Sequence, residues 1–179
     1  EMTFIVAHFG GGNSVSCWFH GCLTDVVPGD AGTFSAERCG FIRGERLLAL
    51  CNQYDAKTIT GWFHGKGGMV SLLGTNDLRE VDKMIQDGDE YALLCQQAMA
   101  YQLSKSIASL FPVTSGNVDG VILTGGGAYW NALVDDIRAR LSYLNVPIYV
   151  RPGENEMQSL AEGALRVLRG EETAHVYNG

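Results

Sequence analysis

Apolar residues near the start of the chain fall into short runs that are rich in β-branched and aromatic side chains and are interrupted by glycine. Such runs are typical of β-strands, and the glycines and the His20–Gly21 pair between them indicate turns. The pattern predicts three short strands in succession, at residues 3–9, 14–20 and 22–27. We expect them to form an antiparallel meander.

The next part of the chain predicts a loop and then helices. Residues 28–44 are rich in glycine, proline and polar side chains, so we expect a long ordered loop. Helices are expected at 44–54, at 56–63, where the helix is short, and at 89–111. Asn76 is a candidate N-cap for a further helix that runs to about Ile85. The apolar residues expected on one buried face of the longest helix are Leu94, Ala98, Tyr101 and Ile107.

The remaining elements alternate between strand and helix. A buried strand is expected at 118–124, a helix from Ala128 to about Ser142, a strand at 146–150 and a last helix from about Asn155. In the first of these helices the residues in register are Leu133, Ile137 and Leu141. The apolar stripe expected on the last helix comprises Met157, Leu160, Ala161, Ala164, Leu165 and Leu168. The tail after Arg169 is polar and is expected to fray.

This order of elements combines an antiparallel meander with strand–helix–strand crossovers. It predicts the α/β class, with a mixed β-sheet and flanking helices. Within residues 1–179 we find no linker and no low-complexity tract, so we expect a single domain.

Composition narrows the class of protein. The chain has 46% hydrophobic and 18% charged residues, which is usual for a folded globular protein. No apolar run approaches the roughly 18–20 residues of a membrane span, and no signal peptide is recognisable. The net charge is −7 and no long basic run is present, which argues against a nucleic-acid partner. We expect neither a membrane nor a nucleic acid as partner.

The five cysteines do not suggest a disulfide framework, because their number is odd and they are scattered. We expect free thiols in a reducing cytoplasm, with Cys51 and Cys95 on apolar helix faces. Cys17, His20 and Cys22 could suggest a zinc site, but their spacing matches no common ligand pattern.

Two glycine triplets each follow an expected strand, and they are the main candidate for chemistry. Glycine leaves backbone N–H groups accessible, which suits a phosphate or a flat ring that lies against the main chain. The second triplet also precedes a helix, whose N-terminal dipole favours an anion. Tight turns alone remain the alternative reading. Neither triplet fits the G-x-G-x-x-G spacing, and the segment HGKGG at 64–68 is not a Walker-type loop.

Six segments in this order carry a resemblance that extends over residues 4–177. They are AHFGGGNSVS, FSAERCG, GKGGMVSLLGTNDLREV, AMAYQLSK, VDGVILTGGGAYW and RPGENEMQSLAEGALRVLRGEE. Together they resemble the C-terminal half of enzymes of the acetate and butyrate kinase family. The resemblance implies an actin-like ATPase (ribonuclease H-like) lobe. It also implies that an N-terminal lobe, with the first phosphate loop, is absent from this chain.

The resemblance assigns roles to particular residues. The residues that look like the second phosphate loop are Gly10, Gly11, Gly12 and Asn13. His8 matches a histidine that contacts the transferring phosphoryl group, and Arg79 matches an arginine that neutralises that group and the acyl carboxylate. The residues that look like the adenosine motif are Gly125, Gly126, Gly127 and Tyr129. Glu156, or Glu154, resembles a carboxylate near Mg²⁺, and Ala161 and Gly163 keep the last helix slim where it crosses the missing lobe.

Elementary chemistry agrees with these residue types. A short fatty acid has a pKa near that of Glu, about 4.3, so the nucleophile is ionised at pH 7 and needs no general base. The difficulty is to bring one anion up to another, which demands positive charge and N–H donors.

Each of these residues also has a structural alternative. His8 could simply be hydrogen-bonded, Arg79 could lie on a solvated helix face, and Glu156 could favour a helix dipole. Glu37 and Arg38 could border an acyl pocket or pair on the surface. The loop at 33–43 departs from the family pattern, and it is a plausible wall of that pocket.

The leading hypothesis is one lobe of an ATP-dependent carboxylate kinase, with ATP/ADP and Mg²⁺ as cofactors and butyrate or a similar short-chain acid as substrate. The isolated lobe is expected to be inactive. One alternative is a nucleotide-dependent regulatory module of the same superfamily without acyl chemistry. Another is an assembly element without catalysis, since the resemblance also implies a homodimer through this lobe.

Overall fold

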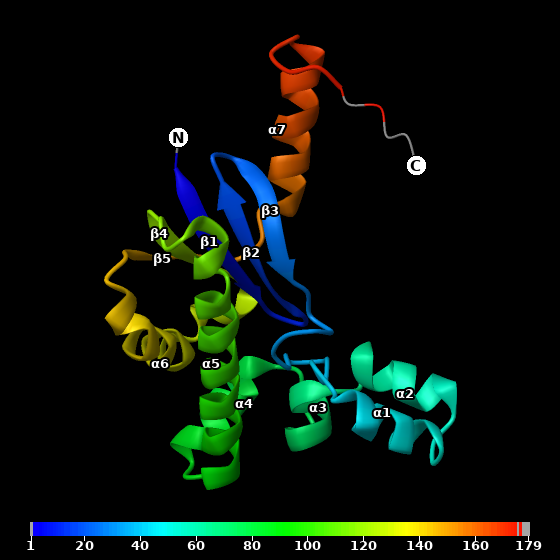
Figure 1. The fold of residues 1–179 in the computed structure, drawn as a ribbon. Helices are drawn as coiled ribbons and strands as arrows, with labels where there is room; N and C mark the ends of the chain where they lie inside the picture. Colours follow the sequence, from blue (N-terminus) through cyan, green and yellow to red (C-terminus); the bar gives the residue numbers. More distant parts are fainter. Residues whose placement is uncertain (1, 175, 177–179) are drawn as a thin grey trace.

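A mixed five-stranded sheet forms the centre of the molecule (Figure 1). The computed structural model describes residues 2–174 and 176. The strands are β1 (Thr3–Phe9), β2 (Asn13–Phe19), β3 (Cys22–Val27), β4 (Gly120–Gly125) and β5 (Ile148–Pro152). Their order is β3-β2-β1-β4-β5, with β1 to β3 antiparallel and β4 and β5 added in parallel. The predicted mixed sheet is therefore confirmed, although β4 and β5 each begin two residues later than expected.

Helices occupy most of the predicted ranges. They are α1 (Gly44–Cys51), α2 (Ala56–Phe63), α3 (Gly68–Leu73), α4 (Leu78–Gln86), α5 (Glu90–Ser109), α6 (Asn131–Leu141) and α7 (Glu156–Leu168). Short 3₁₀ turns lie at Phe111–Thr114, Gly126–Tyr129 and Ser142–Leu144. Helix α3 was not predicted, because glycines at its start usually indicate a loop. Here a Cβ on Gly67 or Gly68 would come within 2.1 Å of the backbone at Trp62 or 2.0 Å of that at Ser35, so tertiary packing requires both glycines.

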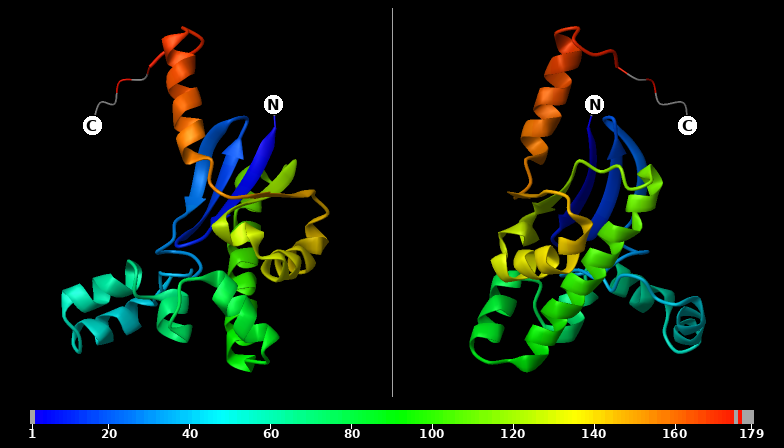
Figure 2. Two further views of the ribbon diagram at one scale, coloured as in Figure 1. Left: turned by 180° about the vertical axis from the view of Figure 1, so that it is seen from behind. Right: turned by 60° about the vertical axis from the view of Figure 1, so that its left-hand side comes forward.

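The core lies between one face of the sheet and helices α5 and α6 (Figures 1 and 2). Alternate residues of β1 point into it, and the expected register of α6 is confirmed by the burial of Leu133, Ile137 and Leu141. The predicted face of α5 is only half right: Ile107 is buried and Ala98 packs partly buried against the core, but Leu94 and Tyr101 are exposed. The buried residues of α5 are Ala92, Cys95, Gln96, Met99, Ala100, Leu103, Ser104 and Ile107. Apolar residues occur on both sides of this helix, so only its neighbours decide which side is covered.

Two local predictions need correction. Asp77, not Asn76, caps α4, and its carboxylate accepts a hydrogen bond of 2.9 Å from the backbone N–H of Arg79. All five cysteines are free, but Cys51 is exposed while Cys95 is buried. Burial raises the pKa of the Cys95 thiol.

Helix α7 extends away from the rest of the molecule (Figures 1 and 2). The expected stripe exists in the sequence, but no residue of α7 is buried, and Met157 and Leu168 are about four-fifths exposed (80% and 82%). Of the tail that was expected to fray, residues 175 and 177–179 lie outside the described residues. No helix in the described ranges is long and apolar enough to cross a membrane.

Candidate active site

The two glycine triplets lie side by side, although more than half of the chain separates them. Strands β1 and β4 are parallel neighbours, so their carboxyl ends meet at one edge of the sheet. A Cβ placed on Gly10 would lie 3.8 Å from the backbone nitrogen of Gly126. The edge of a parallel pair is where α/β proteins commonly bind ligands.

The glycines of the second triplet serve different purposes. Gly125 has φ +91°, and a Cβ there would lie 2.5 Å from the carbonyl oxygen of Phe9. A Cβ on Gly127 would lie 2.7 Å from the Phe9 ring. These two glycines are required by packing against β1. Gly126 faces open space, so nothing in the described chain requires glycine there.

As at Gly126, packing of the described chain does not require glycine at the three positions of the first triplet. None of its glycines has a positive φ, and no backbone atom lies within 3.4 Å of an added Cβ. The tightest neighbour is the flexible end of Arg38, 3.0 Å from a Cβ on Gly12. The N–H of Gly10 bonds within the loop, whereas those of Gly11 and Gly12 have no partner among the described residues. These two N–H groups are available to a ligand.

Asn13 holds this loop in shape from inside. Its side chain is buried, its Oδ1 accepts a hydrogen bond from the Gly10 N–H at 3.2 Å, and its Nδ2 donates to the Phe34 carbonyl at 2.7 Å. Asn13 therefore supports the glycine loop and joins it to the segment that follows β3.

His8 stands at the end of β1 and lines a cleft of about 340 Å³ with Thr124, Glu154, Glu156 and Ser159. Its Nε2 lies 3.1 Å from Oε1 of Glu154, and the imidazole is 40% exposed. The histidine is hydrogen-bonded, as the structural alternative expected, and it also faces a cleft beside the glycine loop.

Glu154 and Glu156 both line this cleft, and Glu156 begins α7. The Oε1 of Glu154 lies 3.9 Å from a Cβ on Gly10, so a carboxylate stands next to the candidate phosphate loop. No group of three or more His, Cys, Asp or Glu residues that could hold a metal occurs in the described ranges. One or two carboxylates nevertheless fit Mg²⁺, which commonly completes its shell with phosphate oxygens and water.

Arg79 is already paired. Its guanidinium donates to both carboxylate oxygens of Asp77, at 2.6 to 3.2 Å, and its side chain is 91% exposed. The hydrogen bonds from Arg79 lower the pKa of the Asp77 carboxyl to about 2. The preceding residue, Leu78, lies 3.4 Å from a Cβ on Gly127, so α4 starts close to the second triplet.

Arg38 is a cation whose position sequence reasoning did not recognise. The turn around it crosses the first triplet, because Ser35 Oγ donates to the Gly11 carbonyl at 2.5 Å and the Glu37 N–H donates to the same oxygen at 3.1 Å. The Arg38 guanidinium then covers Gly12, and it has no ion-pair partner in the part of the chain that the structure describes. No local periodicity could reveal this contact.

Glu37 and Arg38 do not pair with each other. Glu37 Oε1 accepts a hydrogen bond of 2.7 Å from Nδ2 of Asn76, and its Oε2 lies 3.5 Å from a Cβ on Gly11. Glu37 thus ties the glycine loop to the segment that leads into α4. The surface pair considered from the sequence is not formed.

Tyr129 ends the 3₁₀ turn of the second triplet and is 68% exposed. Its hydroxyl lies 3.0 Å from a Cβ on Gly153, so the ring covers the end of β5. Trp130 anchors the start of α6, since its indole N–H donates to Asp82 at 2.7 Å.

Comparison with the sequences of known proteins gives a family and a relative of this chain. The model of the acetokinase family matches residues 1–161. A probable butyrate kinase of Coprothermobacter proteolyticus is 42% identical over 181 aligned residues, which cover 99% of this chain and 51% of that protein. The chain thus spans about half the length of that relative.

Solved structures agree on the fold. Acetate kinase of Porphyromonas gingivalis superimposes with a TM-score of 0.84 at 22% identity, over 93% of this chain and 49% of that one. A propionate kinase of Francisella tularensis gives 0.78 at 23%, over 88% and 47%. These neighbours have the actin-like ATPase fold that the resemblance implied. The chain belongs to the acetokinase family.

Proposed function

We propose that this chain is the C-terminal lobe of an ATP-dependent kinase that phosphorylates a short-chain carboxylate, with butyrate or a similar acid as substrate. The observation that carries the proposal is the meeting of two glycine triplets at one sheet edge, beside His8 and the guanidinium of Arg38, which has no ion-pair partner among the described residues. Family membership and the 42% identity to a probable butyrate kinase support the reaction class.

The geometry supports a division of tasks among the residues. The N–H groups of Gly11 and Gly12 donate to oxygens of the β- and γ-phosphates, and His8 contacts the phosphoryl group in transfer. Arg38 places a positive charge over the same loop. Gly126 and Tyr129 leave a bare backbone and a ring face for the adenosine. Positioning and charge neutralisation of this kind supply most of the catalysis in phosphoryl transfer.

Magnesium fits the acidic side of the cleft. Glu156, with Glu154 beside it, would hold Mg²⁺, which neutralises phosphate charge when bound. Without a cation, the carboxylates of Glu154 and Glu37 next to the first triplet would repel phosphates. This arrangement favours a nucleotide that arrives together with a metal ion.

The other half of the enzyme has two surfaces on which to dock. The apolar stripe of α7 is exposed, and the sheet face opposite the core carries an apolar hollow of about 660 Å³ that includes Phe4, Val6, Trp18 and Ile122. An N-terminal lobe that covered both surfaces would remove this apolar area from water. ATP would then bind between the two lobes.

The direct test uses the two-lobe protein with ATP, Mg²⁺, hydroxylamine and, in turn, acetate, propionate, butyrate and isobutyrate. Acyl hydroxamate is expected with butyrate or an acid close to it in size, and the 179-residue chain alone should form none. Absence of hydroxamate with every acid would overturn the proposed reaction. Turnover by the isolated chain would overturn the two-lobe site.

A further inference from the structure

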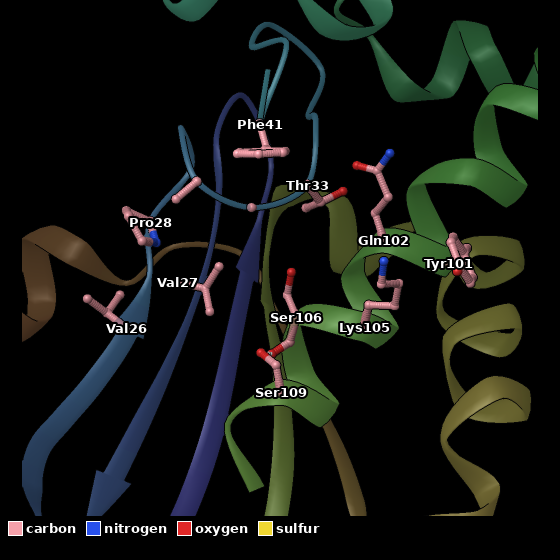
Figure 3. Close-up of a pocket in the computed structure, with 12 residues that line it drawn as sticks. Val26, Val27, Pro28, Thr33, Phe41, Tyr101, Gln102, Lys105, Ser106 and Ser109 are labelled. Atoms are coloured by element: carbon pink, nitrogen blue, oxygen red, sulfur yellow. Dashed lines mark hydrogen bonds between the residues drawn. The ribbon is translucent and has the colours of Figure 1, made fainter. Parts of the chain in front are cut away.

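A second cleft lies between the segment that follows β3 and helix α5 (Figure 3). Its volume is about 600 Å³, within the range of about 300–1,000 Å³ that is usual for small-molecule sites. One wall comes from the end of β3 and residues 28–33, with Phe41 above them, and the other wall is α5. None of its lining residues lines the cleft of His8.

The two walls differ: the wall from β3 and residues 28–33 is mainly apolar, whereas α5 contributes polar side chains and one cation. Val26, Val27 and Pro28 face the cleft, and Phe41 remains 63% exposed beside it. Lys105 on α5 has no carboxylate partner in the described ranges, and its Nζ lies 5.4 Å from the centre of the Tyr101 ring. A single ammonium that faces one apolar wall suits a monoanion with an apolar chain better than a phosphate dianion, for which paired cations or an Arg fork are the usual partners.

Hydrogen bonds link this cleft to the first glycine triplet. Gln102 lines the cleft, and its Oε1 accepts a hydrogen bond of 3.2 Å from the backbone N–H of Phe34. The Phe34 carbonyl accepts the 2.7 Å bond from Asn13, whose Oδ1 accepts the N–H of Gly10 at 3.2 Å. A ligand that fixes Gln102 and residues 32–34 therefore also fixes the loop in which Gly11 and Gly12 expose their N–H groups.

We propose that this cleft binds a small carboxylate with an apolar chain, with the carboxylate at Lys105 and the chain against Val27 and Phe41. Occupancy of the cleft orders the first glycine triplet through Gln102, Phe34 and Asn13. The binding step is independent of the proposed kinase activity. An effect of the carboxylate on nucleotide affinity would rest on the proposed function. If the carboxylate strengthens ATP binding, linkage requires that ATP strengthen carboxylate binding by the same factor.

The test measures binding of octanoate to the two-lobe protein by calorimetry, without nucleotide. The variants are Lys105→Met, which keeps the apolar stem, and Phe41→Ala. Lys83→Met is the matched control, because Lys83 is an exposed helical lysine outside the cleft. Loss of a charge-assisted hydrogen bond should weaken binding by about tenfold or more in Lys105→Met. The control should bind like the wild type.

Hydrogen exchange separately measures the coupling between this cleft and the first glycine triplet. Octanoate should slow exchange at the amides of residues 10–13 in the wild type and not in Lys105→Met. No saturable binding, equal binding by Lys105→Met, or binding that only His8→Ala abolishes would overturn the site. Binding without altered exchange at residues 10–13 would overturn the coupling. An oligomer that dissociates in Lys105→Met would assign the cleft to a subunit interface instead.

Discussion

Arg38 and Arg79 differ in whether their charge is free to act on a ligand. Arg79 is the arginine that the resemblance assigned to the phosphoryl group, but its guanidinium donates hydrogen bonds to Asp77. Arg38 lies over Gly12 without an ion-pair partner in the described chain. A guanidinium stabilises a phosphoryl transition state only where it reaches the transferring group, so we propose that Arg38 carries the larger share.

Replacement of each arginine by alanine in the two-lobe protein separates these roles. We expect Arg38→Ala to lower kcat by about 10³-fold, in line with arginines that neutralise a phosphoryl group. Arg79→Ala should cost far less, since the side chain is 91% exposed and paired. Hydroxamate kinetics give both values. A greater loss in Arg79→Ala would return the role to Arg79, as the sequence predicted.

The adjacent glycines of the second triplet form a matched pair. Gly125→Ala should destabilise the fold by about 1–3 kcal/mol, because the backbone there has φ +91° and ψ 175° and touches Phe9. Gly126→Ala should leave stability unchanged, since its Cβ would enter open space, but it should weaken ATP binding about tenfold. Urea unfolding and nucleotide titration measure the two effects. Full ATP affinity in Gly126→Ala would contradict the proposed nucleotide position.

At the scale of elements, the start of α4 and the buried face of α5 show which features the local sequence predicts and which it does not. Local chemistry predicted a cap near the start of α4, but two neighbouring residues could supply it. The side chain of Asn76 donates a hydrogen bond to Glu37 on another segment, and Asp77 caps the helix instead. In α5 an apolar pattern was present, yet its position relative to β1 and α6 decided which residues became buried.

The pairing of Asp77 with Arg79 predicts an acid dependence of stability. The folded pKa of Asp77 is depressed to about 2, so its contribution is present above the unfolded value of 3.8 and is lost as pH falls through about 2. Asp77→Asn keeps a capping side chain but removes the titration. Urea midpoints from pH 5 to pH 2 should therefore fall less steeply in the variant. Parallel curves would contradict the assignment.

At the scale of the whole molecule, the described residues leave apolar surface exposed, and in the proposed two-lobe protein the second lobe would cover it. The stripe of α7 lies outside the core, and the second face of the sheet is partly bare. The relative that is 42% identical is about twice as long as this chain, and we propose that the other half of such a protein covers both surfaces. Dimer formation through this lobe stays a prediction of the resemblance, and light scattering of the two-lobe protein tests it.

A substitution in α7 tests the docking of the second lobe. Leu160→Lys should destabilise the two-lobe protein by about 1.5–3 kcal/mol, because it removes an apolar side chain that the docked second lobe would bury. In the 179-residue chain the same change should have little effect, since Leu160 is 62% exposed there. Glu162→Gln, on the opposite side of α7, is the control. Equal effects of Leu160→Lys in both proteins would contradict docking on this stripe.

The sequence by itself determined the strands, most of the helices, the two glycine triplets and the family, because these depend on local periodicity, on turn residues and on ordered motifs. The tertiary structure alone decided which triplet glycines the fold requires and that Arg38 covers Gly12. It also decided that no residue of α7 is buried against the described chain. It also placed His8 beside Glu154. These facts depend on a parallel crossover and on loop packing, which bring distant residues together and leave no periodic trace along the chain.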